Sequence, residues 1–127
     1  NGSCWNDAHS MAAAIASLQL CKDNRTASSV MSKGKLFCDQ IESIGHKFGV
    51  PLKMTGLPSM PYPWIEGDED LYKIQALCKL AAKQGLYFHP HHNWFISDAM
   101  TENEINQSLS FSEKAFEEYA AVIASRN

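Results

Sequence analysis

Apolar side chains recur at three- and four-residue spacing in four stretches of the chain, and this periodicity predicts four amphipathic helices. The helices are expected over residues 7–22, from 28 or 29 to 48, 69–84 and 101–123. Asp7 stands before the first stretch as a capping residue does, and Thr101 with Glu104 has the spacing of a capping box before the last. Gly49 and Gly85 follow the second and third stretches, which indicates that those helices end there.

Shorter apolar runs between these stretches predict strands. They fall at residues 50–55, 60–65, 86–89 and 94–97. The prolines within 60–65 mark that run as an edge strand, because proline has no backbone N–H to donate to a neighbour. The order of helices and strands is typical of an α+β domain, with a small, largely antiparallel sheet and helices packed on one of its faces.

The first predicted helix differs from the others in composition. It carries alanine, serine and methionine on several sides rather than a single apolar stripe. A helix that is apolar all round is usually buried. This segment is therefore expected to pack against a body larger than the domain that follows it.

Composition and charge narrow the range of partners. The chain has 127 residues, 45% hydrophobic and 20% charged, as expected for a soluble globular domain. Its net charge of −3 provides no basic stripe for phosphates, so a nucleic acid is not an expected partner. No apolar run approaches the roughly 20 residues that span a bilayer, so a membrane is not expected either.

The cysteines and two of the tryptophans are expected to serve packing. Cys21, Cys38 and Cys78 fall on apolar faces of predicted helices, which favours reduced, buried thiols and a cytoplasmic location. Trp64 and Trp94 are expected in the core or at an interface.

Three segments of the chain resemble the class III pyridoxal-phosphate (PLP) aminotransferases, the group that includes glutamate-1-semialdehyde 2,1-aminomutase. Residues 2–18 open with Gly-Ser and continue into an Ala- and Met-rich helix, like the Gly-Thr pair and helix of that group. Residues 85–90, Gly-Leu-Tyr-Phe-His-Pro, are similar to its Gly-Val-Tyr-Leu-x-Pro element. Residues 97–105 are similar to its Ser-x-Ala-His-Thr-x-x-Asp-Ile element before the final helix.

The resemblance implies the carboxy-terminal segment of a larger enzyme of fold type I. Residues 1–24 would be the cofactor-proximal turn and the connecting helix from the large domain, and residues 25–127 the C-terminal small domain. The missing partner would be an N-terminal large domain. The intact enzyme would be a homodimer that uses PLP to transfer an amino group between a small amine and a carbonyl compound.

The resemblance also assigns a role to Gly2 and Ser3, which would bind the cofactor phosphate through a backbone amide and a hydroxyl. The lysine that carries the cofactor lies upstream of this pair in the family, and the lysines of this chain lie in other contexts. No catalytic residue is therefore expected within the chain. The isolated chain is predicted to be inactive and not to bind PLP tightly.

A second candidate site is the run from His89 to Asn93. His89, His91 and His92 are predicted to lie near a substrate entrance, although two histidines at this spacing also suit a metal in an extended backbone, and surface histidines are a further alternative. The aminomutase has a longer loop with a glutamate here, and Met100 replaces its histidine. Both departures favour a substrate other than the semialdehyde.

Two functions of other classes remain open on the sequence. One is a free-standing, non-catalytic α+β binding module, which predicts a polar outer face on the first helix. The other is a small metalloprotein built on the histidine cluster. Exposed apolar surface on the first helix would instead favour a segment that lacks its other half.

Overall fold

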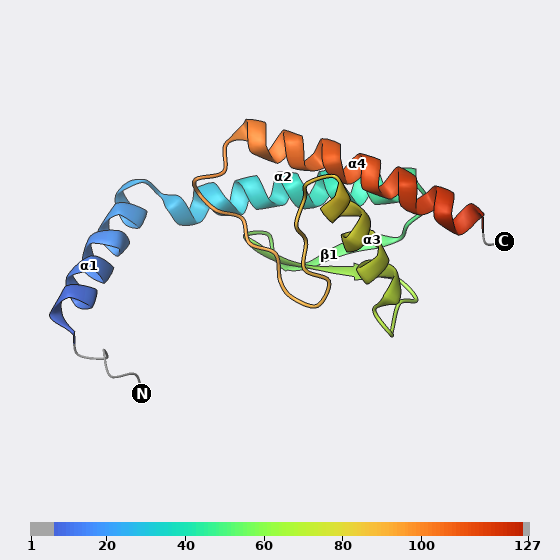
Figure 1. The fold of residues 1–127 in the computed structure, drawn as a ribbon. Helices are drawn as coiled ribbons and strands as arrows, with labels where there is room; N and C mark the ends of the chain where they lie inside the picture. The colour runs from blue at the N-terminus through green and yellow to red at the C-terminus, as the bar shows by residue number, and fades with distance from the viewer. Residues whose placement is uncertain (1–6, 126–127) are drawn as a thin grey trace.

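Two long helices lie side by side over a β-hairpin in the computed structural model, which describes residues 7–125 (Figure 1). They are α2 (Thr26–Lys47) and α4 (Glu102–Ala124), and the hairpin consists of β1 (Leu52–Leu57) and β2 (Met60–Ile65). Helix α3 (Tyr72–Lys83) packs against α4 and β2, and α1 (Ala8–Asp23) precedes α2. The described residues thus form the expected α+β fold, with four helices and a two-stranded antiparallel sheet.

The core fills the space between the helices and the hairpin because each element presents one apolar face to it. Phe37 and Ile41 of α2 belong to one buried cluster with Leu52 of β1 and Ile65 of β2, all of them 3% exposed or less. The remaining fully buried apolar side chains come mainly from α3 and α4, and the largest of them is Phe116. The periodicity of the helices therefore predicted the buried faces.

Strand β2 of the hairpin covers the predicted residues 60–65. It pairs antiparallel with β1, with Leu52 opposite Ile65 at one end and Leu57 opposite Met60 at the other. The turn between the strands is Pro58-Ser59. Pro61, Pro63 and Ile65 are buried at alternate positions of β2, so this strand has one inward face.

The two later strands predicted at 86–89 and 94–97 are wrong, because residues 84–101 form an irregular loop. Part of a third strand is nevertheless present. The backbone N–H of Trp94 donates to the oxygen of Pro61 at 2.8 Å, and that of Ile96 to the oxygen of Ser59 at 3.0 Å. Pro61 has no N–H to return the first of these bonds, so a regular ladder is not completed.

Two helix starts also differ from prediction. Helix α2 begins at Thr26, two or three residues early, directly after Arg25 in the left-handed conformation (φ 52°). Helix α3 begins at Tyr72 rather than 69. The buried Asp68 carboxylate accepts the backbone N–H groups of Lys73 and Ile74, both at 2.9 Å, and so sets the later start.

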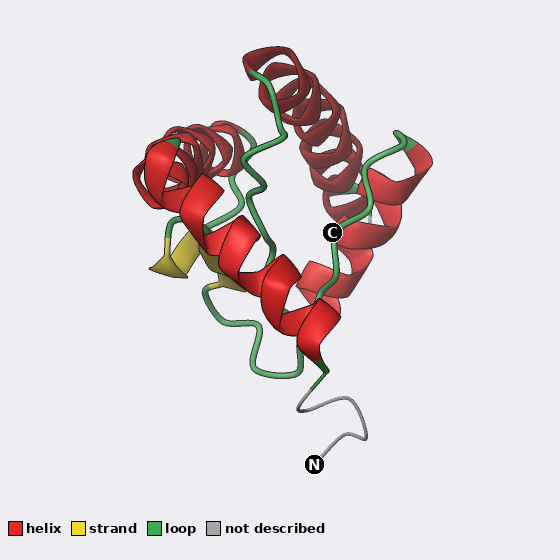
Figure 2. Ribbon diagram, turned by 90° about the vertical axis from the view of Figure 1, so that its left-hand side faces the viewer, coloured by secondary structure: helices red, strands yellow, loops and turns green. Residues whose placement is uncertain are grey.

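Helix α1 extends away from the rest of the molecule and has no buried residue (Figures 1 and 2). The prediction that Cys21 is buried is therefore wrong, since its thiol lies on this exposed helix. Cys78 is buried and Cys38 partly so, and desolvation raises their thiol pKa values to about 12 and about 11. Trp94 is buried as expected, but Trp64 is 36% exposed on the hairpin, so it does not belong to the core, and its place at an interface stays a prediction.

None of the helices in residues 7–125 combines the length and the apolar character needed to cross a membrane.

Candidate functional site

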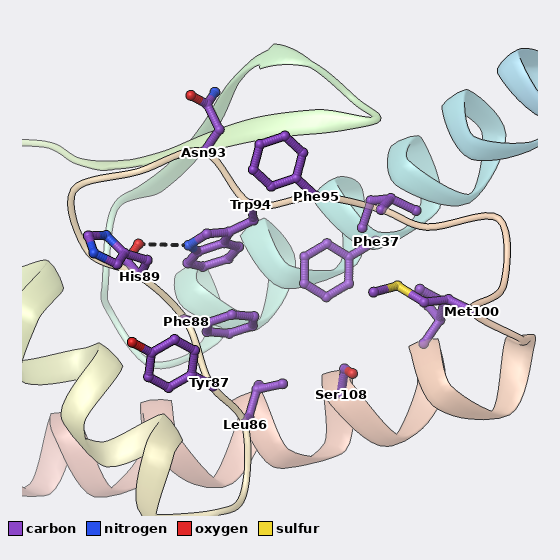
Figure 3. Close-up of a pocket in the computed structure, with 12 residues that line it drawn as sticks. Phe37, Leu86, Tyr87, Phe88, His89, Asn93, Trp94, Phe95, Met100 and Ser108 are labelled. Carbon is purple, nitrogen blue, oxygen red and sulfur yellow. Dashed lines mark hydrogen bonds between the residues drawn. The ribbon is translucent and has the colours of Figure 1, made fainter. Parts of the chain in front are cut away.

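A pocket of about 260 Å³ opens between the loop at residues 84–101, α2 and the start of α4 (Figure 3). Phe37 comes from α2, and Ile105 and Ser108 come from α4. The loop supplies the remaining lining residues, which are Leu86, Tyr87, Phe88, His89, Asn93, Trp94, Phe95, Ile96 and Met100. The continuous stretch from the loop into α4 therefore builds this site together with α2, which is distant in the sequence.

An aromatic cluster forms the floor of the pocket. The rings of Phe88 and Trp94 stack with centroids 3.8 Å apart and an interplanar angle of 8°. Phe37 meets both rings edge-on, at 6.3 and 6.4 Å. The Trp94 indole N–H donates to the backbone oxygen of His89 at 2.9 Å, which joins the two sides of the loop (Figure 3).

The loop is tied to the hairpin and to α2 by polar contacts. The Asn93 side-chain amide donates to the oxygen of Met60 at 3.1 Å. At the other end of the loop the Asp98 carboxylate accepts the hydroxyls of Ser29 (2.7 Å) and Thr26 (3.2 Å). The hydrogen bond from Ser29 is the main cause that lowers the pKa of Asp98. The position of the pocket wall therefore depends on these anchors at both ends.

Of the three predicted histidines, the structure places only His89 in the pocket lining. Its Nδ1 accepts the backbone N–H of His91 at 3.1 Å within a turn, so the chain is not extended here. The ring of His89 lies 6.2 Å from that of His91 and 5.9 Å from that of His92. Within residues 7–125, no group of three or more His, Cys, Asp or Glu side chains is arranged to hold a metal ion.

The pocket is apolar and carries no fixed charge: of the described lining residues, none is Asp, Glu, Lys or Arg. The lysines of the chain are exposed, except for the half-buried Lys33, which donates to the backbone oxygen of Asp98. This arrangement is suited to holding an apolar group, with the His89 imidazole at the edge. Among its described lining residues, no nucleophile is paired with a base.

The other predicted site residues, Gly2 and Ser3, lie outside the described residues. Sequence reasoning did not assign Phe37, Ile105 or Ser108 to a site. The helical spacing predicted core positions for Phe37 and Ile105 and made no prediction for Ser108, and the local signal for the pocket was the aromatic run around the histidines.

No protein-family model matches the chain. Two curated proteins are similar to the chain in sequence. Aminopentol aminotransferase of Sphingopyxis macrogoltabida is 31% identical over 115 residues, which are 91% of this chain and 27% of the relative. 3-Aminobutyryl-CoA aminotransferase of Cloacimonas acidaminovorans is 29% identical over 97 residues, or 73% of this chain and 23% of the relative. The chain thus spans about a quarter of the length of these relatives.

Solved structures that are similar to the chain come from the same kind of protein as these two relatives. A PLP form of the FumI protein from a Sphingopyxis species matches 98% of this chain with a TM-score of 0.90 and 30% identity, over 30% of its own length. A PLP-bound transaminase shares the fold, with a TM-score of 0.68 and 17% identity. The match covers 75% of this chain and 24% of the transaminase. An omega-transaminase from Sphaerobacter thermophilus also shares the fold. Its TM-score is 0.65 at 13% identity, and the match covers 72% of this chain and 24% of the transaminase. A match over 98% of the chain includes α1, so the placement of this helix agrees with a PLP enzyme structure.

Proposed function

The chain is related in sequence and in fold to the PLP-dependent aminotransferases, and on this premise we propose that it serves as the carboxy-terminal part of a class III enzyme of this kind. The enzyme would transfer an amino group between a small amine and a carbonyl compound. The observation that carries the proposal is the TM-score of 0.90 over 98% of the chain. We favour transfer between two molecules over an aminomutase reaction, because both curated relatives are named aminotransferases.

Residues 25–127 would form the small domain, and residues 1–24 would lead into it from a large domain. The exposed apolar side chains of α1 support this division. Met11, Ile15 and Leu18 share one side of the helix and are 48%, 70% and 70% exposed. Leu20 lies on the opposite side and is 61% exposed. A helix with apolar side chains on opposite sides fits enclosure by a large partner, whereas a free-standing binding module requires a polar outer face.

When bound, PLP supplies the electron sink for the transfer of the amino group. Gly2 and Ser3 would contact its phosphate. Since no lysine of the described residues lines the pocket, the lysine that carries the cofactor would come from the large domain. The role left to the described residues is to bind and orient the substrate at the entrance, where His89 lies, and to exclude water. His91 and His92 would lie on the outer side of this entrance.

The proposal extends to a homodimer with shared active sites and to a cytoplasmic location. The raised pKa values of Cys38 and Cys78 keep these thiols protonated and unreactive, which is compatible with reduced cysteines.

The decisive experiment expresses this chain together with the coding sequence that precedes it in the genome. We expect the longer protein to retain PLP through gel filtration and to transfer an amino group from an amine to a 2-oxo acid, measured as the amino acid formed. The 127-residue chain alone should do neither. A longer protein that binds PLP no better than the chain alone would refute the proposal.

The docking of α1 can be tested in the same longer protein with Ile15→Asp. We expect this variant to lose PLP retention and activity, because a charge would be buried against the large domain. Ile15→Leu keeps an apolar side chain of the same size at this position and serves as the matched control, expected to retain PLP and activity. Equal effects of the two substitutions would contradict an apolar docking face.

A further inference from the structure

A second hollow of about 510 Å³, the α3–α4 groove, is formed by side chains within residues 72–83 of α3 and 119–123 of α4. It shares no lining residue with the pocket at the loop. We infer that this groove binds the carboxylate form of a medium-chain fatty acid. The hydrocarbon chain would lie on its apolar floor, and the carboxylate would lie at lysines of its rim. The inference goes beyond the proposed function and does not depend on it.

The floor of the groove is apolar, and much of it faces solvent. Leu80 and Tyr119 are buried, whereas Val122 and Ile123 near the end of α4 are exposed. Tyr72 at the start of α3 is exposed as well. Apolar surface gathered between two helices favours an occupant that removes it from water.

The rim of the groove is positively charged. Lys73, Lys79 and Lys83 of α3 are the charged side chains among the described lining residues. The Lys73 ammonium donates to the oxygen of Gly67 at 2.7 Å, and that of Lys83 lies 3.4 Å from the Glu118 carboxylate. Within residues 7–125, the Lys79 ammonium takes part in no hydrogen bond or ion pair. This cation therefore has its charge and its three N–H donors available to a ligand.

The spacing of the charges indicates where a carboxylate would lie. Lys79 and Lys83 are four residues apart, so they lie on one side of α3 and repel each other. A carboxylate between them would relieve this repulsion and accept an N–H from each. At the start of the helix, the buried Asp68 carboxylate disfavours a second anion. The ligand would therefore have its carboxylate near Lys79 and Lys83 and its chain running toward Tyr72.

The combination of floor and rim selects the class of ligand. An inorganic anion would use the lysines but leave the apolar floor in water, and an alkylammonium ion would cover the floor but meet charges of its own sign. A fatty acid anion satisfies both parts of the site. The volume of the groove lies in the range of roughly 300–1,000 Å³ that is usual for small-molecule sites.

The position of the groove keeps it apart from the docking helix of the proposed function. Figure 1 shows α3 and the end of α4 on the side of the molecule away from α1. A large domain that packs along α1 is therefore expected to leave the groove open to a ligand.

The test titrates the 127-residue chain, labelled with ¹³C at the isoleucine δ1-methyl groups, with decanoate. We expect a saturable shift of the Ile123 methyl, whereas Ile105 at the other pocket and Ile15 on α1 should not move. Affinity should rise about two- to fourfold per added methylene from hexanoate to decanoate. Decylamine has the same chain with the opposite charge and should bind at least about tenfold more weakly.

Two pairs of substitutions at exposed positions test the floor and the rim. Ala76→Phe fills the groove and should weaken decanoate binding at least about tenfold, whereas Ala82→Phe places the same ring on α3 outside the lining and should leave binding unchanged. Lys79→Met keeps a long, unbranched side chain without its charge and should weaken binding about threefold. Lys53→Met on the hairpin is its matched control.

Absence of a saturable Ile123 shift in a chain with dispersed methyl signals would overturn the inference. So would equal binding within either pair of variants, or larger shifts at Ile105 or Ile15. An acidic amphipathic peptide is titrated in parallel, and an Ile123 shift with this peptide but not with decanoate would assign the groove to a protein partner instead.

Calorimetry on the longer protein of the proposed function should give the same affinity for decanoate as the 127-residue chain. Loss of binding in the longer protein would show that the large domain occupies the groove, and the inference would be wrong. Failure of the amino-transfer assay would leave the fatty acid site unaffected, because the binding measurements need neither PLP nor activity.

Discussion

Gly34 is the residue that allows α2 to cross the turn of the hairpin at close range. A Cβ at this position would overlap the backbone carbonyl of Pro58, which has little freedom to move within the turn. Glycine is normally unfavourable inside a helix, because it exposes the backbone and loses more entropy than alanine. Its presence in α2 is therefore explained by a tertiary contact.

Gly34→Ala is expected to destabilise the chain by about 2 kcal/mol, because the overlap outweighs a gain in helix propensity of up to about 1 kcal/mol. Gly45→Ala is a graded control in the same helix. Its Cβ would come no closer than 3.1 Å to the Leu52 side chain and the Val50 oxygen, so we expect a smaller loss. Urea unfolding followed by circular dichroism measures both, and equal losses would show that close packing at Gly34 is not the cause.

Asp98 links stability to pH. Hydrogen bonds from Ser29, then from Thr26, together with the charge of Lys33, lower its pKa below the ordinary 3.8. A lowered folded-state pKa contributes stability that is present above pH 3.8 and is lost as the pH falls through the folded value. Asp98→Asn should therefore reduce the stability difference between pH 7 and pH 3.

The loss of this pH dependence should be partial, because Asp7 and Glu104 also have lowered pKa values. Asp70→Asn, at an exposed position, is the control and should retain the pH dependence of the parent. The measurement is the urea midpoint of each protein at the two pH values. An unchanged difference in Asp98→Asn would contradict the role of this carboxylate.

At the scale of elements, α4 owes its start to a capping box recognisable in the sequence. The Thr101 hydroxyl accepts the N–H of Glu104 at 3.5 Å, and the Glu104 carboxylate accepts the N–H of Thr101 at 2.6 Å. The second bond is the main cause that lowers the pKa of Glu104. The box matters beyond the helix, since Met100 and Ile105 beside it both line the pocket.

Thr101→Ala should cost about 1 kcal/mol of stability, as losses of an N-cap usually do. Thr101→Ser retains the hydroxyl and should cost much less. Thermal unfolding of the three proteins gives the comparison. If both substitutions have the same effect, the methyl group of Thr101 and not the cap supplies the stability.

At the scale of the whole molecule, two regions of unequal stability follow from the distribution of buried surface. Helices α2, α3 and α4 bury side chains against the hairpin, whereas α1 buries none. A helix of 16 residues without packing is only marginally stable in water. The chain should therefore unfold in parts, beginning with α1.

Hydrogen exchange of the 127-residue chain should show amides of α1 exchanging much faster than those of α2 and α4. In the longer protein of the proposed function, α1 should gain protection because the large domain would cover it. Mass spectrometry of peptides from both proteins tests this. Protection of α1 in the short chain alone would indicate association between copies, and the concentration dependence of exchange would reveal it.

The sequence predicted the helices more accurately than the loop. Capping residues and apolar periodicity act over a few neighbours, so α4 and the buried side of α2 could be recognised directly. Residues 86–89 and 94–97 have strand-like composition, but whether they pair depends on the partner strand. That partner presents Pro61, which accepts one bond and cannot return it.

The sequence by itself thus determined the four helices, the hairpin, the order in which they follow and the apolar character of α1, because these properties depend on local composition and spacing. Only the tertiary structure decided which side chains form the pocket, since Phe37, Trp94 and Ser108 come from separate segments that meet only on folding. It also decided that His89 faces the pocket while His91 and His92 do not line it. A turn at residues 90–92, in the stretch between the two predicted strands, causes that difference.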